Sequence, residues 1–184
     1  MLIRHADPAA HGPACAAIYA PSVRDGVASF EEVAPDGAEM TERITRITAG
    51  HPWLVALEGP DVLGYAYASR HRDRPAYRWA ADTTAYVAAA HQRRGVGRAL
   101  YGALLALLRR QGLYSAVAGI TLPNEASVGL HEQMGFELVG TYREIGFKHG
   151  AWRTVGWWQA RLREPVPGET PAEPGPPARL EDLD

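Results

Sequence analysis

Residues 82–111 read DTTAYVAAAHQRRGVGRALYGALLALLRRQ, and this stretch decides the fold that we expect. β-Branched and aromatic residues between Thr83 and Val87 predict a short strand. Apolar residues at helical spacing then predict an amphipathic helix over residues 96–111, and Gly112 is typical of a helix end. The apolar stripe consists of Val96, Leu100, Ala103, Leu104, Leu107 and Leu108.

Two glycines stand where the strand turns into the helix. Gly95 and Gly97 leave backbone N–H groups uncovered at the positive end of the helix dipole, which suits a phosphate or pyrophosphate. A P-loop needs a lysine after its second glycine, and a dinucleotide fingerprint needs a third glycine; this chain has neither. The pattern present is Q-x-x-G-x-G, at Gln92, Gly95 and Gly97. An ordinary strand-to-helix turn eased by glycine remains the alternative.

Composition limits the possible classes of protein. A chain of 184 residues with 46% apolar and 22% charged residues is typical of one globular domain. The net charge of −2 and the lack of a dense basic patch give no reason to expect a nucleic-acid partner. Cys15 is the single cysteine, so we expect no disulfide within the chain. The histidines, His71 among them, lack metal-ligand spacing, so we expect no metal site and assign these histidines to surface or packing roles. No apolar signal core or membrane-spanning run appears, so we expect a cytoplasmic protein without a membrane partner.

Predicted strands and helices alternate along the rest of the chain. The patterns indicate strands at 2–5, 53–57, 62–69 and 116–120, helices at 8–23, 38–49 and 124–134, and a closing hairpin of 136–147 with 152–161. Such an order predicts an α/β protein with a mixed sheet flanked by helices over residues 1–162. Residues 163–184 are rich in proline and glycine with mostly acidic charges, and this composition predicts a disordered tail.

Three further segments complete the pattern. They read YRWAADTTAYV at 77–87, LPNEASVGLHEQMGF at 122–136 and GFKHGAWRTVGWWQ at 146–159. With the glycine loop, they resemble the phosphinothricin and methionine sulfoximine N-acetyltransferases of the GNAT superfamily, over nearly all of residues 1–162. The resemblance implies the GNAT acyl-CoA N-acyltransferase fold, with a mostly antiparallel sheet, and transfer of an acetyl group from acetyl-CoA to a small acidic amino acid.

The resemblance also implies two catalytic residues. Asp82 stands where the family normally carries a glutamate base, and a carboxylate can take a proton from the amine directly or through water. The side chain of Asp82 is one methylene shorter than that of a glutamate. The alternative is that Asp82 only ends a strand or caps the loop. His131 stands where the superfamily commonly has a tyrosine that protonates the departing thiolate, and a histidine can exchange protons near neutral pH. The alternative is a histidine packed against the sheet or solvated.

The remaining site residues follow from the same resemblance. Its acetyl-CoA contacts correspond to Tyr86, Val87, Gln92, Arg93, Arg94, Gly95, Val96, Gly97, Arg98, Asn124 and Ser127. A backbone N–H near Tyr86 or Val87, where the family's strand bulges, is expected to stabilise the oxyanion, and Asn124 also suits a plain helix N-cap. The acceptor pocket corresponds to Phe30, Arg72, Arg74 and Tyr77. Arginine suits a carboxylate or phosphinate, and we expect Arg74 and Tyr77 to anchor the acid groups with Arg72 in support; a solvated basic loop is the alternative.

The family usually forms homodimers that involve the late hairpin, so we expect residues 148–152 to lie at a dimer interface. Trp152 is the kind of residue enriched at interfaces, and packing into its own core is the alternative. An acetyltransferase for another small amine and a non-catalytic CoA-binding module on the same fold remain alternatives to the expected enzyme. An acidic residue at position 82 together with the intact glycine loop favours the enzyme.

Overall fold

The chain alternates strands and helices in the predicted order. A computed structural model describes residues 1–183. The strands are β1 Leu2–His5, β2 Trp53–Glu58, β3 Asp61–Arg70, β4 Ala80–Val87, β5 Ser115–Leu122, β6 Glu137–Lys148 and β7 Ala151–Arg161. The helices are α1 Pro8–Arg24, α2 Gly37–Thr48, α3 Val96–Gln111 and α4 Glu125–Gln133, with short 3-10 helices η1 Pro75–Tyr77, η2 Ala89–His91 and η3 Leu180–Leu183.

The strands form one sheet in the order β1-β2-β3-β4-β5-β7-β6. Neighbouring strands are antiparallel except β4 and β5, which are parallel. The mixed, mostly antiparallel sheet and the closing β6–β7 hairpin are therefore confirmed. β4 starts at Ala80, three residues before the predicted start, because its first residues pair with β3 and β5 in a way that local sequence does not reveal.

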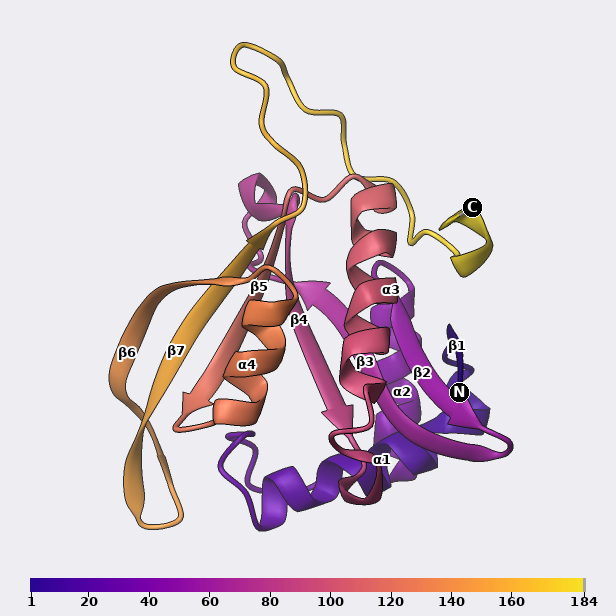
Figure 1. The fold of residues 1–184 in the computed structure, drawn as a ribbon, viewed down its shortest axis with the longest axis vertical. Helices are drawn as coiled ribbons and strands as arrows, with labels where there is room; N and C mark the ends of the chain where they lie inside the picture. Colours follow the sequence, from indigo (N-terminus) through magenta and orange to yellow (C-terminus); the bar gives the residue numbers. More distant parts are fainter. Residues whose placement is uncertain (184) are drawn as a thin grey trace.

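Helices cover both faces of the sheet (Figure 1). On β2, Leu54 and Ala56 join the core beneath α3, whereas Trp53 and Val55 join the core beneath α1 and α2. This division follows from the period-2 alternation of side chains along a strand. The apolar stripe predicted on α3 is buried, with Leu100, Leu104, Leu107 and Leu108 each at 0% exposure. Among residues 1–183, no helix combines the length and apolar character that crossing a membrane requires.

The segment after Arg163, which composition predicts to be disordered, contacts the rest of the chain at several points. It first projects away from the sheet as a loop, then returns to the end of α3 and continues towards β1 (Figure 1). The indole N–H of Trp79 donates to the Ala172 carbonyl at 2.8 Å, and the Gly175 N–H donates to the Gln111 carbonyl at 2.8 Å. Ala178 is 8% exposed and joins the core beneath α3. The amino-acid composition of a segment does not indicate a few specific contacts of this kind, so composition alone could not predict the position of this segment.

Candidate active site

Strands β4 and β5 diverge near the centre of the sheet. Their parallel pairing runs only from Ala80 with Ser115 to Asp82 with Val117, although both strands continue for several residues. A cleft of about 410 Å³ opens between the diverging ends, and we call it the β4–β5 cleft. Besides residues 83–87 of β4 and 118–121 of β5, it is lined by Ile18, Ser22, Ala28, Ser29, Gln92, Tyr101, Asn124, Ser127 and His131.

The family resemblance implied a bulge in β4, but in this structure the divergence of β4 and β5 exposes the β4 backbone to the cleft instead. The register of β4 with β3 is continuous from Ala81 to Val87, so the β4 backbone has no bulge near Tyr86. Beyond Asp82, the edge of β4 that faces β5 is no longer paired in the sheet. Backbone donors can therefore face the cleft without an inserted residue.

The start of α3 is open, as the glycine pattern indicates. Gly95 is the N-cap residue with a φ of 81°, and no side chain caps the helix. A Cβ placed on Gly95 would have no neighbour within 4 Å, so this backbone faces open space. A Cβ on Gly97 would lie 3.0 Å from a methyl of Leu130 on α4, so Gly97 also permits close packing of the two helices. Free N–H groups at a helix start suit a phosphate group.

Three exposed arginines surround this helix start. Arg93 adopts a positive φ of 59°, and Arg98 lies in the first turn of α3. Arg94 bonds to the Nδ1 atom of His91 at 2.8 Å and lies 3.7 Å from the Glu58 carboxylate. These cations add positive charge around the open N–H groups. The loop thus has the electrostatics that a pyrophosphate requires.

Helix α4 places a fixed histidine in the cleft. Asn124 caps the helix, and its Oδ1 accepts from the Ser127 N–H at 3.1 Å. His131 is 6% exposed, and burial lowers the pKa of its ring. In the neutral ring, Nδ1 donates to the Ser127 carbonyl at 2.7 Å and Nε2 accepts from the Tyr101 hydroxyl at 2.7 Å. Both ring nitrogens are engaged, so a proton that moves between His131 and the cleft passes through the Tyr101 hydroxyl.

Asp82 lies at the last paired position before the strands diverge. Its Oδ1 is 2.6 Å from the Nδ1 atom of His71, a residue that the sequence pattern assigned to the surface or packing. Burial raises the pKa of Asp82, and the contact with His71 opposes this rise. When Asp82 is ionised, Nδ1 of His71 must carry the shared hydrogen. His71 thereby orients the carboxylate.

A second cleft, of about 350 Å³, lies beside His71 and Ala80, the neighbours of Asp82. We call it the hairpin cleft, and its lining consists of His71, Arg72, Tyr77, Ala80, Ser115, Val117, Val139, Tyr142, Trp157 and Gln159. Ala80 and Asp82 are two residues apart on β4 and so point to the same face of the sheet. The Arg72 guanidinium lies 6.0 Å from the centre of the Trp157 ring. The cleft therefore combines a cation, aromatic walls and a neighbouring carboxylate.

The structure brings most predicted residues to these places. Six of them line the β4–β5 cleft: Tyr86, Val87, Gln92, Asn124, Ser127 and His131. Arg72 and Tyr77 line the hairpin cleft. Phe30 and Arg74 are outside the lining of both clefts; Phe30 packs over Gly146 of β6, and Arg74 is exposed ahead of η1.

Two site residues were not predicted. His71 escaped notice because its partner Asp82 comes from the next strand, and only the β3–β4 register brings them together. Tyr101 was not among the predicted site residues or the apolar stripe; the one signal was a hydroxyl among the apolar residues of α3. Within residues 1–183, no group of three or more His, Cys, Asp and Glu side chains is arranged to hold a metal ion.

Known proteins share this arrangement. The acetyltransferase (GNAT) family model matches residues 21–136. A phosphinothricin N-acetyltransferase of Streptomyces viridochromogenes is 44% identical over 129 residues, which are 70% of each chain. A methionine sulfoximine/methionine sulfone acetyltransferase of Pseudomonas aeruginosa is 35% identical over 152 residues, 82% of this chain and 88% of the relative.

A solved structure agrees over nearly the whole chain. The phosphinothricin acetyltransferase of Sinorhizobium meliloti, in complex with acetyl-CoA, superposes with a TM-score of 0.84 at 36% identity. The match covers 91% of this chain and 94% of that protein.

The open helix start beside a cleft between diverging strands defines an enzyme that binds an acyl-CoA and transfers its acyl group to an amine. The chain belongs to the acetyltransferase (GNAT) family and is an acetyl-CoA-dependent N-acetyltransferase. The predicted family, fold, enzyme class and co-substrate are thereby confirmed.

Proposed function

We propose that this enzyme acetylates the amino group of a small acidic amino acid or analogue, such as phosphinothricin or methionine sulfoximine or sulfone. The observation that carries the proposal is the position of Asp82, which is in neither cleft lining but stands on β4 between Ala80 of the hairpin cleft and Thr83 of the β4–β5 cleft. Relatives named for these substrates, at 44% and 35% identity, support it.

In this proposal the start of α3 binds the pyrophosphate of acetyl-CoA. The N–H groups of Val96, Gly97 and Arg98 donate to phosphate oxygens, and the arginines around the loop balance the charge. Bound acetyl-CoA supplies an activated thioester. The β4–β5 cleft leads from this loop past backbone donors of β4, so these donors can stabilise the oxyanion at the thioester carbon.

Asp82 acts as the base. An α-amino group has a pKa of about 8, so only about a tenth is neutral at pH 7. Asp82, held by His71, takes the proton directly or through one water and leaves a neutral amine to attack. The departing thiolate receives a proton from the Tyr101 hydroxyl, which Nε2 of His131 holds in place as the acceptor of its hydrogen bond. A proton from water then restores the hydroxyl.

Arg72 and Tyr77 anchor the acid groups of the acceptor. Both line the hairpin cleft next to Asp82, and a guanidinium pairs well with a carboxylate or phosphinate. The sequence favours Arg74 as the anchor, with Arg72 in support. Because Arg72 lines the hairpin cleft and Arg74 lies outside its lining, the proposal takes Arg72 instead.

Replacing Arg72 with alanine should therefore lower kcat/KM for an acidic amino acid by at least about 10-fold, since a hydrogen bond to a charged group is worth ~1.5–3 kcal/mol. Most of the loss should appear in KM, because the contact is similar in the ground and transition states. Arg74→Ala is the matched control, from the same loop but outside the cleft, and should change kcat/KM little. Equal losses for charged and uncharged amines would show that Arg72 does not recognise the acid group.

We also propose a homodimer formed through the β6–β7 hairpin. This hairpin carries exposed apolar side chains at Leu138, Val139, Tyr142, Ile145, Phe147 and Trp152. Trp152 is 61% exposed and contacts Phe147 edge to face at 5.4 Å, so it is not part of its own core. Large aromatic side chains exposed together are typical of interfaces. A cytoplasmic location stays a prediction.

Light scattering on the full chain should then give the mass of a dimer, and Trp152→Arg should shift it towards the monomer. Val166→Arg, at a position with 57% exposure in the tail, is the control and should leave the mass unchanged. A fully active wild-type monomer would contradict the dimer.

A further inference from the structure

The end of β6 carries the only lysine of the chain, Lys148, among 19 lysine and arginine residues. The side chain is buried, with Lys148 at 7% exposure. Its Nζ donates to the backbone carbonyls of Ser29 and Glu31 at 2.5 and 2.9 Å. An ammonium group has three donors and a compact charge, so it can satisfy two carbonyls of one loop at once. Burial of such a charge is costly unless it is bonded in this way.

The loop that Lys148 contacts, residues 25–36 between α1 and α2, has little structure of its own. Among the described residues, none from 27 to 35 takes part in a backbone–backbone hydrogen bond. Side chains supply the missing contacts. Besides Lys148, the Ser29 Oγ accepts from the Glu31 N–H at 3.1 Å, and the His149 Nε2 donates to the Gly26 carbonyl at 3.1 Å. The position of this loop therefore depends on the β6–β7 hairpin.

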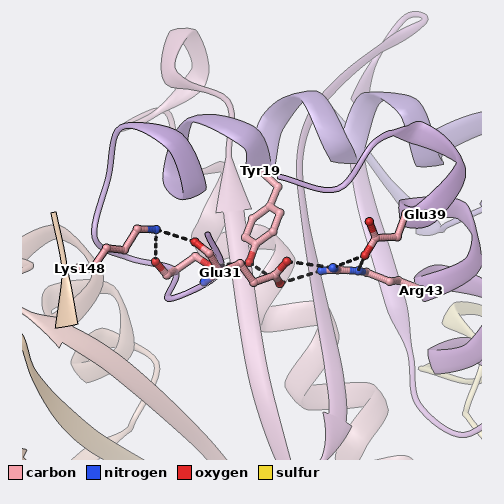
Figure 2. Close-up of polar contacts among 6 residues, drawn as sticks. Tyr19, Glu31, Glu39, Arg43 and Lys148 are labelled. Atoms are coloured by element: carbon pink, nitrogen blue, oxygen red, sulfur yellow. Dashed lines mark hydrogen bonds and ion pairs between the residues drawn. The ribbon is translucent and has the colours of Figure 1, made fainter. Parts of the chain in front are cut away.

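A second tether holds the same loop from the opposite side, as Figure 2 shows. The Glu31 carboxylate accepts two hydrogen bonds from Arg43 of α2, at 2.7 and 2.9 Å. It also accepts from the Tyr19 hydroxyl of α1 at 2.8 Å. The hydrogen bonds from Arg43 lower the pKa of Glu31, so the pair stays ionised. Glu39 bonds to the same guanidinium at 2.5 Å and fixes its orientation.

The tethered loop forms part of the reaction site. Ala28 and Ser29 line the β4–β5 cleft, and Ser29 is 6% exposed. Phe30, between the two carbonyls that Lys148 binds, packs on Gly146, where a Cβ would come within 2.2 Å of the ring. Phe30 therefore bridges the loop and β6. A shift of the loop would move both Ser29 and Phe30.

We propose that Lys148 is a positioning residue that sets the acceptor side of the site by fixing the loop of residues 25–36 through the carbonyls of Ser29 and Glu31. The proposal rests on the proposed function. Ala28 and Ser29 line the β4–β5 cleft, where the thioester would meet the amine, so the proposal assigns the loop to the approach of the acceptor amine and not to binding of the pyrophosphate. Among the described residues, none of the hydrogen bonds that hold the loop of residues 25–36 involves the helix start at Gly95.

The test compares Lys148→Met, which keeps the length and removes the donors, with Lys148→Arg, which keeps them. Lys148→Met should raise the acceptor KM at least 10-fold at saturating acetyl-CoA, while the acetyl-CoA Kd measured by calorimetry stays within twofold of wild type. Lys148→Arg should recover most of the loss. Hydrogen exchange of the Glu31 N–H, which donates to the Ser29 Oγ, should become faster in Lys148→Met alone. Arg110→Met, an exposed basic residue of α3, is the matched control and should behave as wild type.

An unchanged acceptor KM in Lys148→Met, or equal losses of acceptor and acetyl-CoA binding, would overturn the proposal. If Lys148→Met does not fold, Lys148→Gln, which keeps an N–H donor on a shorter chain, replaces it under the same two criteria. A wild-type enzyme that acetylates no acidic amino acid would instead refute the proposed function. Faster exchange of the Glu31 N–H in Lys148→Met would still then show that Lys148 fixes the loop.

Discussion

Replacing Asp82 with asparagine is expected to lower turnover by about 10²- to 10⁴-fold, the usual contribution of general acid–base catalysis. The amide keeps the size of the side chain and a hydrogen-bonding oxygen but cannot take a proton from the amine. Acetyl-CoA affinity should stay close to wild type, because Asp82 lies away from the start of α3. Steady-state kinetics with an acidic amino acid and calorimetry with acetyl-CoA measure the two quantities.

The pH profile gives an independent check on Asp82. Burial raises the pKa of this carboxylic acid, and only its ionised form is a base. Activity should therefore fall as pH decreases through this raised pKa, above the range of an exposed aspartic acid. Asp82→Asn should lack this limb, Asp82→Glu should retain activity or raise it, and Asp61→Asn, at an exposed position of β3, should match wild type. Normal turnover of Asp82→Asn across pH 6–9 would show that Asp82 is not the base.

Gly95→Val is expected to weaken acetyl-CoA binding by at least about 100-fold. A β-branched residue strongly disfavours the φ of 81° found at Gly95, so the turn that presents the N–H groups would be lost. Two hydrogen bonds to a charged pyrophosphate, at ~1.5 kcal/mol each, account for this factor. Gly97→Val is a less direct test, because its side chain would also press on Leu130 of α4.

Gly95→Asn is the matched control, since asparagine tolerates the left-handed conformation better than other residues with a Cβ. A Cβ at this position meets no protein atom within 4 Å, so the added side chain by itself causes no clash. Calorimetry should show a small loss for Gly95→Asn and a large loss for Gly95→Val. Unchanged affinity in a folded Gly95→Val protein would contradict the assignment of the loop to the pyrophosphate.

The parts of the fold that depend on residues close together in the sequence could be predicted from it. The apolar period of residues 96–111 and the glycines ahead of it are local signals, and α3 and its open start follow from them. The divergence of β4 and β5 has no such signal, because it depends on where two strands 28 residues or more apart stop pairing. The same holds for His71 beside Asp82, which requires the register of β3 with β4.

Contacts between distant segments account for the remaining differences. Lys148 and Ser29 are 119 residues apart, and no pattern near either one indicates their hydrogen bond. The sequence favours Arg74 over Arg72 as the anchor, yet Arg72 lines the hairpin cleft, whereas Arg74 precedes η1 outside it, and no local pattern indicates this difference. The tail was predicted from composition alone, whereas its position depends on Ala178 and on backbone contacts with the end of α3.

The most direct test of the proposed function is thiol release from acetyl-CoA by the wild-type enzyme across a panel of amines. The panel contains phosphinothricin, methionine sulfoximine, methionine sulfone, the common amino acids and simple uncharged amines. We expect the highest kcat/KM for the acidic analogues, because Arg72 and Tyr77 hold their acid groups beside Asp82. A higher kcat/KM for uncharged amines, or no thiol release with any acidic amino acid, would contradict the proposed substrate class.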